Sequence, residues 1–361
     1  MGKNAFLGIA IALGLAVAGV FSLRSDNATV STSLLFPELE QQLNDVSSVR
    51  IIGANNQTKV TLQRQGETWV VEEKTNHPAD VTELRKLLQG LASAKQVEQK
   101  TSKPELYDRL GVEGMDVESP SGLLLSVDMG DVSRDLIIGQ TLASGGDASY
   151  VRKPDEAASW LVDQDLSVDD NPIEWLARDI IDLTSDRVQK VIVTSGESEL
   201  VVSKANQAET NFSIQDVPDD RELRYEGVAN ALAGVLAGLQ FDDVVRRPDN
   251  LGDSNLEATF SSFDGLSVTV SGFEEEDGKF ITIAASVDAE QASRFFEAPA
   301  EPGSGDEESA PAQVGEPDLT AVNNEVVSIT KTTAAWLYVI PDYKYDQIQK
   351  DMEDMLKPLE E

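Results

Sequence analysis

The chain contains two stretches in which the same short patterns follow one another in the same order. Each stretch has an aspartate followed by alternating valines, two strand-like segments, a helix-like segment with a glycine near its end, and a tryptophan strand. The paired segments are 45–51 and 186–193, 60–62 and 200–202, 69–71 and 212–214, 87–91 and 235–239, and 160–162 and 336–339. Any one match could arise by chance, but the shared order predicts two tandem copies of one module.

Within each copy, alternation of apolar and polar residues indicates strands that are buried on one face, as at residues 123–127 and 266–270. One helix is expected at residues 79–94, and a second at 228–239, because their apolar residues recur at helical spacing. Several strands, one helix and further strands predict an α+β fold class, with a mostly antiparallel sheet and a packed helix in each repeat.

The N-terminus adds an apolar stretch, residues 5–23, without a charged side chain. As a helix it would be about 28 Å long, close to the roughly 30 Å hydrocarbon core of a bilayer. The sequence therefore predicts an N-terminal transmembrane helix, and the small residues at 16–18 leave a cleaved signal peptide as the alternative. The apolar residues of this membrane anchor are Ala5, Leu7, Ile9, Ile11, Leu13, Leu15, Val17, Val20, Phe21 and Leu23.

The charges around this span set its predicted orientation. Lys3 precedes the span, whereas Arg24 is followed at once by Asp26, so the positive-inside rule places the N-terminus in the cytoplasm. The predicted localisation is the bacterial inner membrane, single-pass, with the body in the periplasm. The expected segments are an anchor at 1–24, a first module at 25–166, a linker at 167–184, a second module at 185–345 with a disordered acidic insertion at 298–319, and a C-terminal helix at 346–361.

Composition excludes several classes of function. Lys and Arg total 29 against 64 Asp and Glu, giving a net charge of −35, so the chain lacks the basic face that nucleic acid requires. It has no cysteine and one histidine, which excludes thiolate and multi-histidine metal sites. The sequence predicts no cofactor, metal site or catalytic residue. The acidic surface could serve basic substrates or reflect a saline habitat, and both interpretations stay open.

Three groups of residues are candidates for chemistry. His77 has no identifiable catalytic partner nearby, so a structural role at the start of a helix is preferred. Ser328 and Lys331 form a Ser-x-x-Lys pattern that fits strand alternation and lacks its companion motifs. A calcium loop is imitated by Asp163, Asp165, Ser167, Asp169 and Glu174, but Val168 replaces the required glycine, and a solvated linker is preferred.

The segment 100–112 (KTSKPELYDRLGV) resembles a signature of the DUF4340 family. Further resemblance lies in segments around it, namely 69–71, 77–80, 136–139, 150–152 and 171–176. It covers the anchor and most of the first copy well, and the second copy more loosely. The resemblance implies a membrane-anchored auxiliary of an ABC transport system of the gliding-motility type. It implies no catalytic residue.

The function predicted from these observations is that of a non-enzymatic, single-pass inner-membrane protein. It would act as an accessory or scaffold subunit of an ABC-type transport complex, with permease or ATPase subunits as partners. The alternative is a periplasmic ligand- or glycan-binding module with a site between the two repeats. The aromatic side chains available for such a site are Trp69, Trp160, Trp175 and Trp336.

Overall fold

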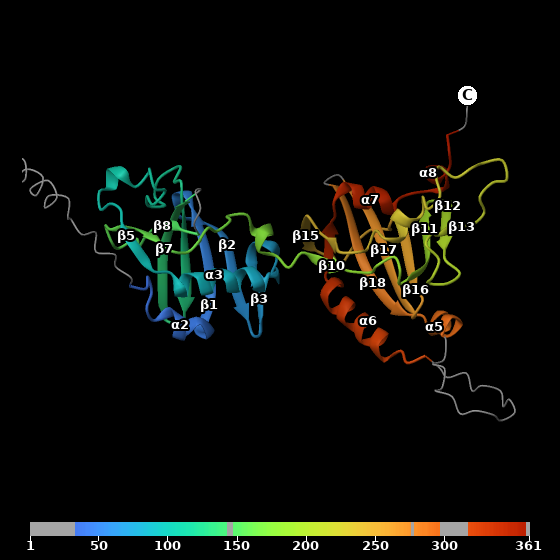
Figure 1. Cartoon of the computed structure of the whole chain (residues 1–361), viewed down its shortest axis with the longest axis horizontal. Coiled ribbons are helices and arrows are strands. Elements are labelled where there is room, and N and C mark those ends of the chain that lie inside the picture. Colours follow the sequence, from blue (N-terminus) through green and yellow to red (C-terminus); the bar gives the residue numbers. More distant parts are fainter. Residues whose placement is uncertain (1–32, 143–146, 276–277, 297–316, 359–361) are drawn as a thin grey trace, which may run out of the picture. The chain divides into compact units, whose positions relative to one another are not determined.

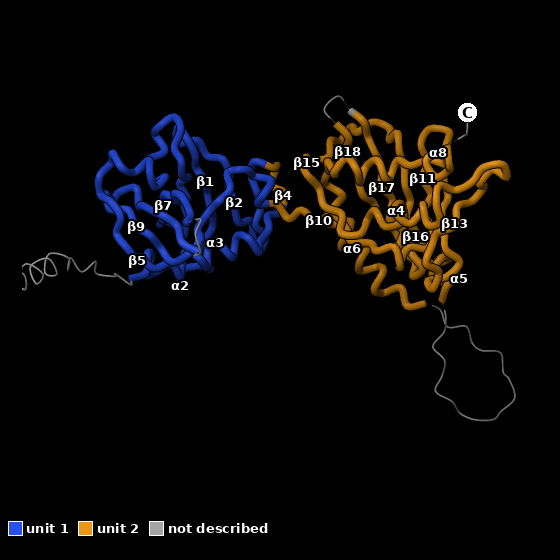
Figure 2. The backbone as a smooth tube through the Cα atoms, turned by 45° about the horizontal axis from the view of Figure 1, so that its top comes forward, with its two compact units in different colours: residues 1–73, 78–175 blue, residues 74–77, 176–361 orange. Residues whose placement is uncertain are grey.

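A computed structural model describes residues 33–142, 147–275, 278–296 and 317–358. The chain divides into two compact units (Figure 2). The first consists of the described residues up to 73 together with 78–175, and the second consists of residues 74–77 and the described residues from 176 onward. Each unit is built around its own antiparallel sheet, and the two are described separately.

The first unit contains a nine-stranded sheet (Figure 1). Alternation along the central strand puts Val49 and Ile51 on a fully buried face, while Arg50 points to the opposite face. Val49 lies opposite Leu62 of the next strand, so the same face continues across the sheet. In spatial order the strands are β4 (His77–Pro78), β3 (Thr68–Val71), β2 (Gln57–Gln65), β1 (Val46–Gly53), β6 (Leu123–Met129), β7 (Val132–Thr141), β8 (Ser149–Arg152), β9 (Ser159–Val162) and β5 (Gln96–Gln99).

One amphipathic helix, α3 (Val81–Ser93), covers the apolar face of this sheet. Asp80 begins the helix, because its carboxylate accepts hydrogen bonds from the backbone N–H groups of Thr82 and Glu83 at 2.7 and 3.4 Å. The leucines at helical spacing are buried, as the sequence predicts, and are Leu84, Leu87, Leu88 and Leu91. The short helices of this unit are α2 (Leu39–Gln42), η1 (Leu43–Asp45), η2 (Ala54–Asn56), η3 (Glu72–Lys74, shared with the second unit), η4 (Pro104–Leu106) and η5 (Pro172–Trp175).

The second unit contains an eight-stranded sheet and a two-stranded sheet. The strands of the larger sheet are, in spatial order, β13 (Ser213–Ile214), β12 (Ser198–Ser203), β11 (Val188–Ser195), β16 (Leu256–Ser262), β17 (Leu266–Glu275), β18 (Gly278–Val287), β19 (Trp336–Val339) and β15 (Asp243–Arg246). The smaller sheet pairs β10 (Asp179–Ile181) with β14 (Leu239–Gln240).

The two large sheets share one strand order, from β3 to β5 in the first unit and from β13 to β15 in the second. They also share an irregularity of register at the same place. The pairing of β1 with β6 shifts between Val46 and Ser48, and that of β11 with β16 shifts between Val188 and Lys190. A bulge at matching positions is a specific feature of backbone geometry, so the strands can be compared one by one.

The helix expected at 228–239 is the largest local difference from the sequence analysis. Only α4 (Asn230–Ala233) forms there, and Gly234 follows it as the C-cap. Gly227 and Gly238 have φ values of +78° and +52°, a backbone conformation that ends a helix and that glycine adopts readily. Glycines on both sides therefore restrict this helix to one turn. The other helices of the unit are α5 (Ala289–Phe295), α6 (Thr320–Thr333), α7 (Asp342–Ile348) and α8 (Met352–Met355).

Arg187 holds α6 against the second sheet. Its Nη1 and Nη2 donate to the two carboxylate oxygens of Glu325 on α6 at 2.8 and 2.6 Å, and its Nε donates to Asp264 at 3.0 Å. This bidentate geometry is the strong form of an arginine–carboxylate pair. It raises the pKa of Arg187, so the guanidinium stays charged.

We expect this attachment to weaken in acid. Burial raises the pKa of Asp264, but hydrogen bonds from Ser262 and Arg187 outweigh it and hold the pKa below its usual value of 3.8. A lowered folded-state pKa contributes stability that is present above pH 3.8 and is lost as the pH falls through the folded-state value. Thermal unfolding measured between pH 7 and pH 3 should show a smaller acid-induced loss in Asp264→Asn than in the wild type. Asp249→Asn, at an exposed carboxylate of the same unit, should behave as the wild type, and equal acid sensitivity of all three proteins would contradict the expectation.

The structure differs from the sequence-based prediction in fold class, in the membrane span and in the localisation. The fold is three antiparallel sheets with few helices, rather than an α+β fold preceded by a transmembrane helix. Among the described helices, none combines the length and the apolar character needed to cross a bilayer. The longest, α6, has 14 residues and would extend only about 21 Å. This finding overturns the predicted single-pass arrangement and the inner-membrane localisation that depended on it.

The anchor residues themselves, Ala5 to Leu23, lie outside the described residues, as does most of the predicted acidic insertion at 298–319. The predicted C-terminal helix at 346–361 is replaced in the described residues by α7 and α8, which residues 349–351 separate. Asp351 begins α8 with a capping box that it forms with Asp354, so the chain starts a new helix there instead of continuing the old one.

Candidate functional site

His77 is packed among aromatic rings of the second unit. Its side chain is 4% exposed, and its ring meets those of Phe241 and Trp336 edge-on at centroid distances of 5.1 and 4.6 Å. Edge-to-face contacts of this kind stabilise a core. They agree with the structural role that the sequence analysis preferred.

The carboxylates of the calcium-like loop face backbone N–H groups instead of a common centre. Asp163 accepts from Lys95 at 2.7 Å, Asp165 from Ser167 at 2.9 Å and Asp169 from Asn171 at 2.8 Å. Two of these bonds are Asx turns, which hold a loop without any ion. Within the part of the chain that the structure describes, no group of three acidic or histidine side chains is placed to bind a metal.

Ser328 and Lys331 lie on the helix α6, so the interpretation of this segment as a strand was wrong. The tryptophans have separate surroundings. Trp175 is buried and donates from Nε1 to the carbonyl oxygen of Asp169 at 2.9 Å. Trp336 is also buried, and the Arg246 guanidinium lies over its ring, 5.4 Å from the ring centroid. The Nε1 of Trp160 is buried without an acceptor among the described residues. Trp69 is half-buried beside α3.

The signature segment 100–112 supports the second face of the first sheet. Tyr107 and Val112 pack with Met115 and Ile137 into a small apolar cluster, which also touches Ile52 and Leu124. Ile52 and Leu124 are cross-strand partners on the face opposite α3. The segment therefore gives part of this face a core of its own.

Arg152, at the end of β8, holds the signature segment in place. Its Nε donates to the carbonyl oxygen of Val112 at 2.8 Å, and its guanidinium lies 4.5 Å from the centroid of the Tyr107 ring. Its Nη1 also donates to three further carbonyl oxygens, those of Lys153, Pro154 and Glu156. A buried guanidinium with four carbonyl acceptors is a structural centre, because it joins the buried carbonyl of Val112 to the loop that follows β8.

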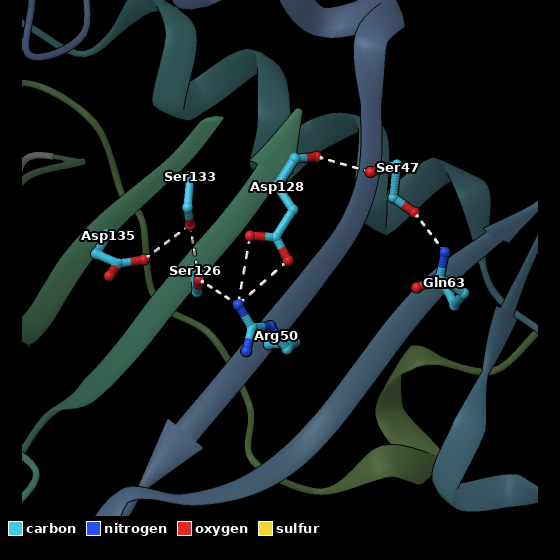
Figure 3. A network of polar contacts seen from close by, with 7 residues as sticks. All are labelled: Ser47, Arg50, Gln63, Ser126, Asp128, Ser133 and Asp135. Carbon is cyan, nitrogen blue, oxygen red and sulfur yellow. Dashed lines mark hydrogen bonds and ion pairs between the residues drawn. The ribbon is translucent and has the colours of Figure 1, made fainter. Parts of the chain in front are cut away.

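The rest of this face carries a polar network, which we call the Arg50 surface (Figure 3). It spans four adjacent strands in the middle of the sheet, β2, β1, β6 and β7. Arg50 Nη2 donates to the Ser126 hydroxyl at 3.1 Å and to Asp128 Oδ1 at 3.3 Å. The Arg50 surface consists of Ser47, Arg50, Gln63, Ser126, Asp128, Ser133 and Asp135.

A broad, open depression of about 590 Å³ lies over part of this network. Its lining includes Thr58 and the carboxylates of Glu72 and Glu73 as well as Arg50 and Asp128. Arg50 is only partly compensated, since its Nε is buried without an acceptor among the described residues. Because an unmet buried donor is unfavourable, polar sites of this kind in native proteins call for a functional or structural explanation.

The chemistry of the Arg50 surface favours binding. Its closest approach to a catalytic pair is the Ser133 hydroxyl, which donates to Asp135 at 3.2 Å. An exposed carboxylate is a weak base at neutral pH, so this pair would activate a hydroxyl poorly. Donors, acceptors and charges of both signs at short spacing instead match a polar surface of a partner.

One known protein family matches this chain. A family model described as a domain of unknown function (DUF4340) matches residues 69–259, more than half of the sequence. The chain belongs to the DUF4340 family. No curated protein and no solved structure gave a significant match. The DUF4340 match begins at Trp69 on β3 and ends at Thr259 on β16, so it includes the signature segment, Arg152 and Asp128, whereas Arg50 lies before it.

Proposed function

We propose that this chain is a non-enzymatic binding subunit of an ABC-type transport complex of the gliding-motility type, and that the Arg50 surface contacts a partner subunit. The DUF4340 resemblance supports the choice of complex, because it implies an auxiliary of such a transport system. The observation that carries the proposal is a charged network in the middle of a sheet, on a face that the signature segment covers only in part.

Position and chemistry both favour a protein partner. Arginine is enriched at the centres of interfaces, where its planar guanidinium can bind carboxylates and carbonyl oxygens of the partner. Arg50 is already oriented by Ser126 and Asp128, so little side-chain entropy would be lost on binding. The open depression beside it leaves room for an approaching loop or strand.

Site-specific photo-crosslinking tests this proposal. A photoreactive residue replaces Gln63 at the Arg50 surface or, as the control, exposed Gln99 on the edge strand β5. After irradiation of intact cells and solubilisation in mild detergent, mass spectrometry identifies the crosslinked chains. We expect an ABC permease or ATPase subunit at position 63 and not at position 99.

A charge reversal provides the matching loss-of-binding test. Arg50→Glu places a carboxylate beside Asp128 and should reduce co-purification of the transporter subunits at least tenfold, whereas Arg109→Glu at an exposed site should not. Circular dichroism establishes that both variants are folded. Purification of the wild-type chain without any transporter subunit would contradict the proposed function.

A further inference from the structure

A second depression, of about 440 Å³, lies on the other face of the first sheet, between α3 and the hairpin of β2 and β3. Its apolar part is formed by Trp69 with Leu84 and Leu88 of α3, and Val81 beside them is 44% exposed. We call this depression the Trp69 groove. It is lined by Leu43, Asn44, Arg64, Glu67, Trp69, Val81, Leu84, Arg85, Leu88 and Gln89.

The second unit contains the corresponding position, and there it is closed. The cross-strand pair of Leu62 and Val71 corresponds to the pair of Val202 and Ile214. Two residues closer to the turn of each hairpin, Arg64 therefore corresponds to Lys204, and Trp69 to Phe212. Lys204 and Phe212 are 6% and 5% exposed, and the lysine Nζ lies 4.5 Å from the centroid of the phenylalanine ring. In the first unit the tryptophan is accessible instead.

The helix side of the groove differs in the same direction. The matched segments 87–91 and 235–239 place Val81 and Arg85 at the positions of Ala229 and Ala233. Both alanines are completely buried, whereas Val81 and Arg85 are exposed. A sheet with the same strand order therefore forms with alanines at the positions of Val81 and Arg85, which indicates that the fold does not require these two side chains.

Loop length explains why one site is closed and the other is open. In the second unit, residues 204–212 join β12 to β13, and Phe212 N–H donates to the Asn230 side chain at 2.9 Å. The Asn230 amide donates in turn to Asn211 at 2.7 Å, so this loop is tied to α4. In the first unit a two-residue turn, Gly66 and Glu67, joins β2 to β3 and leaves the groove uncovered.

We infer that the Trp69 groove binds a saccharide. A sugar ring has an apolar C–H face that packs on an indole, and a rim of hydroxyl groups that both donate and accept hydrogen bonds. The groove offers an indole lined by the side chains of Asn44, Glu67, Arg85 and Gln89, none of which makes a hydrogen bond to another described side chain. These side chains supply both donors and acceptors, as hydroxyl groups require.

Other occupants fit less well. The volume of the groove lies in the range of small-molecule sites. A purely apolar ligand would leave the charges at the rim without partners. A nucleoside could stack on the indole, and it is therefore the competing ligand in the test.

The test uses the full chain labelled with ¹⁵N, in which the indole N–H signals of the four tryptophans are assigned by single Trp→Phe variants. Glucose, N-acetylglucosamine, galacturonate and adenosine are each titrated to about 50 mM, a range that detects millimolar dissociation constants. We expect at least one saccharide to shift the Trp69 signal saturably while the signal of buried Trp336 stays in place.

Rim variants make the result specific to the groove. Arg85→Met and Gln89→Ala change exposed side chains, so they should keep the fold and weaken saccharide binding by about five- to tenfold. Arg109→Met, at an exposed position outside the groove, is the matched control and should bind as the wild type. A response to adenosine alone, no response to any saccharide, or binding unchanged in both rim variants would overturn the inference. The groove and the Arg50 surface lie on opposite faces of the sheet, so this result is independent of the crosslinking experiment.

Discussion

Gly122→Ala is expected to separate the signature segment from the first sheet, at a cost of about 3 kcal/mol or more in the free energy of unfolding of that unit. A Cβ at position 122 would collide with the backbone carbonyl oxygens of Gly111 and Ile138. Gly139→Ala would collide in the same way with those of Leu110 and Gly111. Backbone atoms cannot move aside as a flexible side chain can, so the segment itself must be displaced.

Urea unfolding and hydrogen–deuterium exchange of peptides covering residues 104–117 measure this effect. Gly130→Ala is the control, because Gly130 has a φ of +61° but no heavy atom within 4 Å of the added methyl group. It should cost only about 1 kcal/mol, from the left-handed backbone conformation alone. A loss in Gly122→Ala no larger than that in Gly130→Ala would show that the close approach of the two backbones does not determine stability.

Arg152→Met is expected to destabilise the first unit by about 3–5 kcal/mol. The variant keeps most of the side-chain volume but removes the donors that reach Val112 and three other carbonyl oxygens. It also removes the cation–π contact with Tyr107. The buried carbonyl of Val112 would then lack this donor, and an unsatisfied buried acceptor is more unfavourable than the loss of the bond alone.

Thermal and urea unfolding monitored by tryptophan fluorescence would detect this loss, since Trp69, Trp160 and Trp175 all belong to the first unit. Arg152→Lys keeps the charge but cannot reproduce the planar set of donors, so it should recover only part of the stability. Arg109→Met, at an exposed arginine of the signature segment, should change stability by less than about 0.5 kcal/mol. Equal stability of the Arg152 and Arg109 variants would contradict the structural role of Arg152.

Strand positions could be predicted where the pattern is local. Alternation located β6 and β17, and the tryptophan segments fall on β9 and β19, which occupy corresponding places next to β5 and β15. The expected helix at 79–94 corresponds to α3, because an aspartate cap and a run of leucines at helical spacing act together there.

Longer-range features could not be read in this way. The segment 228–239 has apolar residues at helical spacing, but Gly227 just before it and Gly238 near its end adopt left-handed φ values that only the surrounding structure selects. The segment containing Ser328 and Lys331 alternates like a strand, yet it is helical. Val322 and Ile329, seven residues apart and therefore on one face of a helix, both pack inward.

The Arg50 surface could not be predicted from the sequence, because it is assembled by the pairing of distant strands. Along β1 alone, Ser48 and Arg50 are ordinary polar residues on the alternate face. Only the register places Arg50 opposite Ser126 and Ser48 opposite Asp128, which gathers residues about 80 positions apart into one network. The signature segment gave the opposite result. It was recognisable, but Tyr107 and Val112 serve packing.

The shared strand order also has a consequence for how each unit folds. The edge strand β5 can join its sheet only after β9 is in place, and β15 only after β19. These pairings join residues that are roughly 60 and 90 positions apart in the chain. By the logarithmic dependence of loop-closure entropy on length, the longer connection in the second unit costs only about 0.4 kcal/mol more. Residues added between β15 and β19, or between β5 and β9, therefore cost little free energy. Such a chain can lengthen there during evolution without losing its architecture.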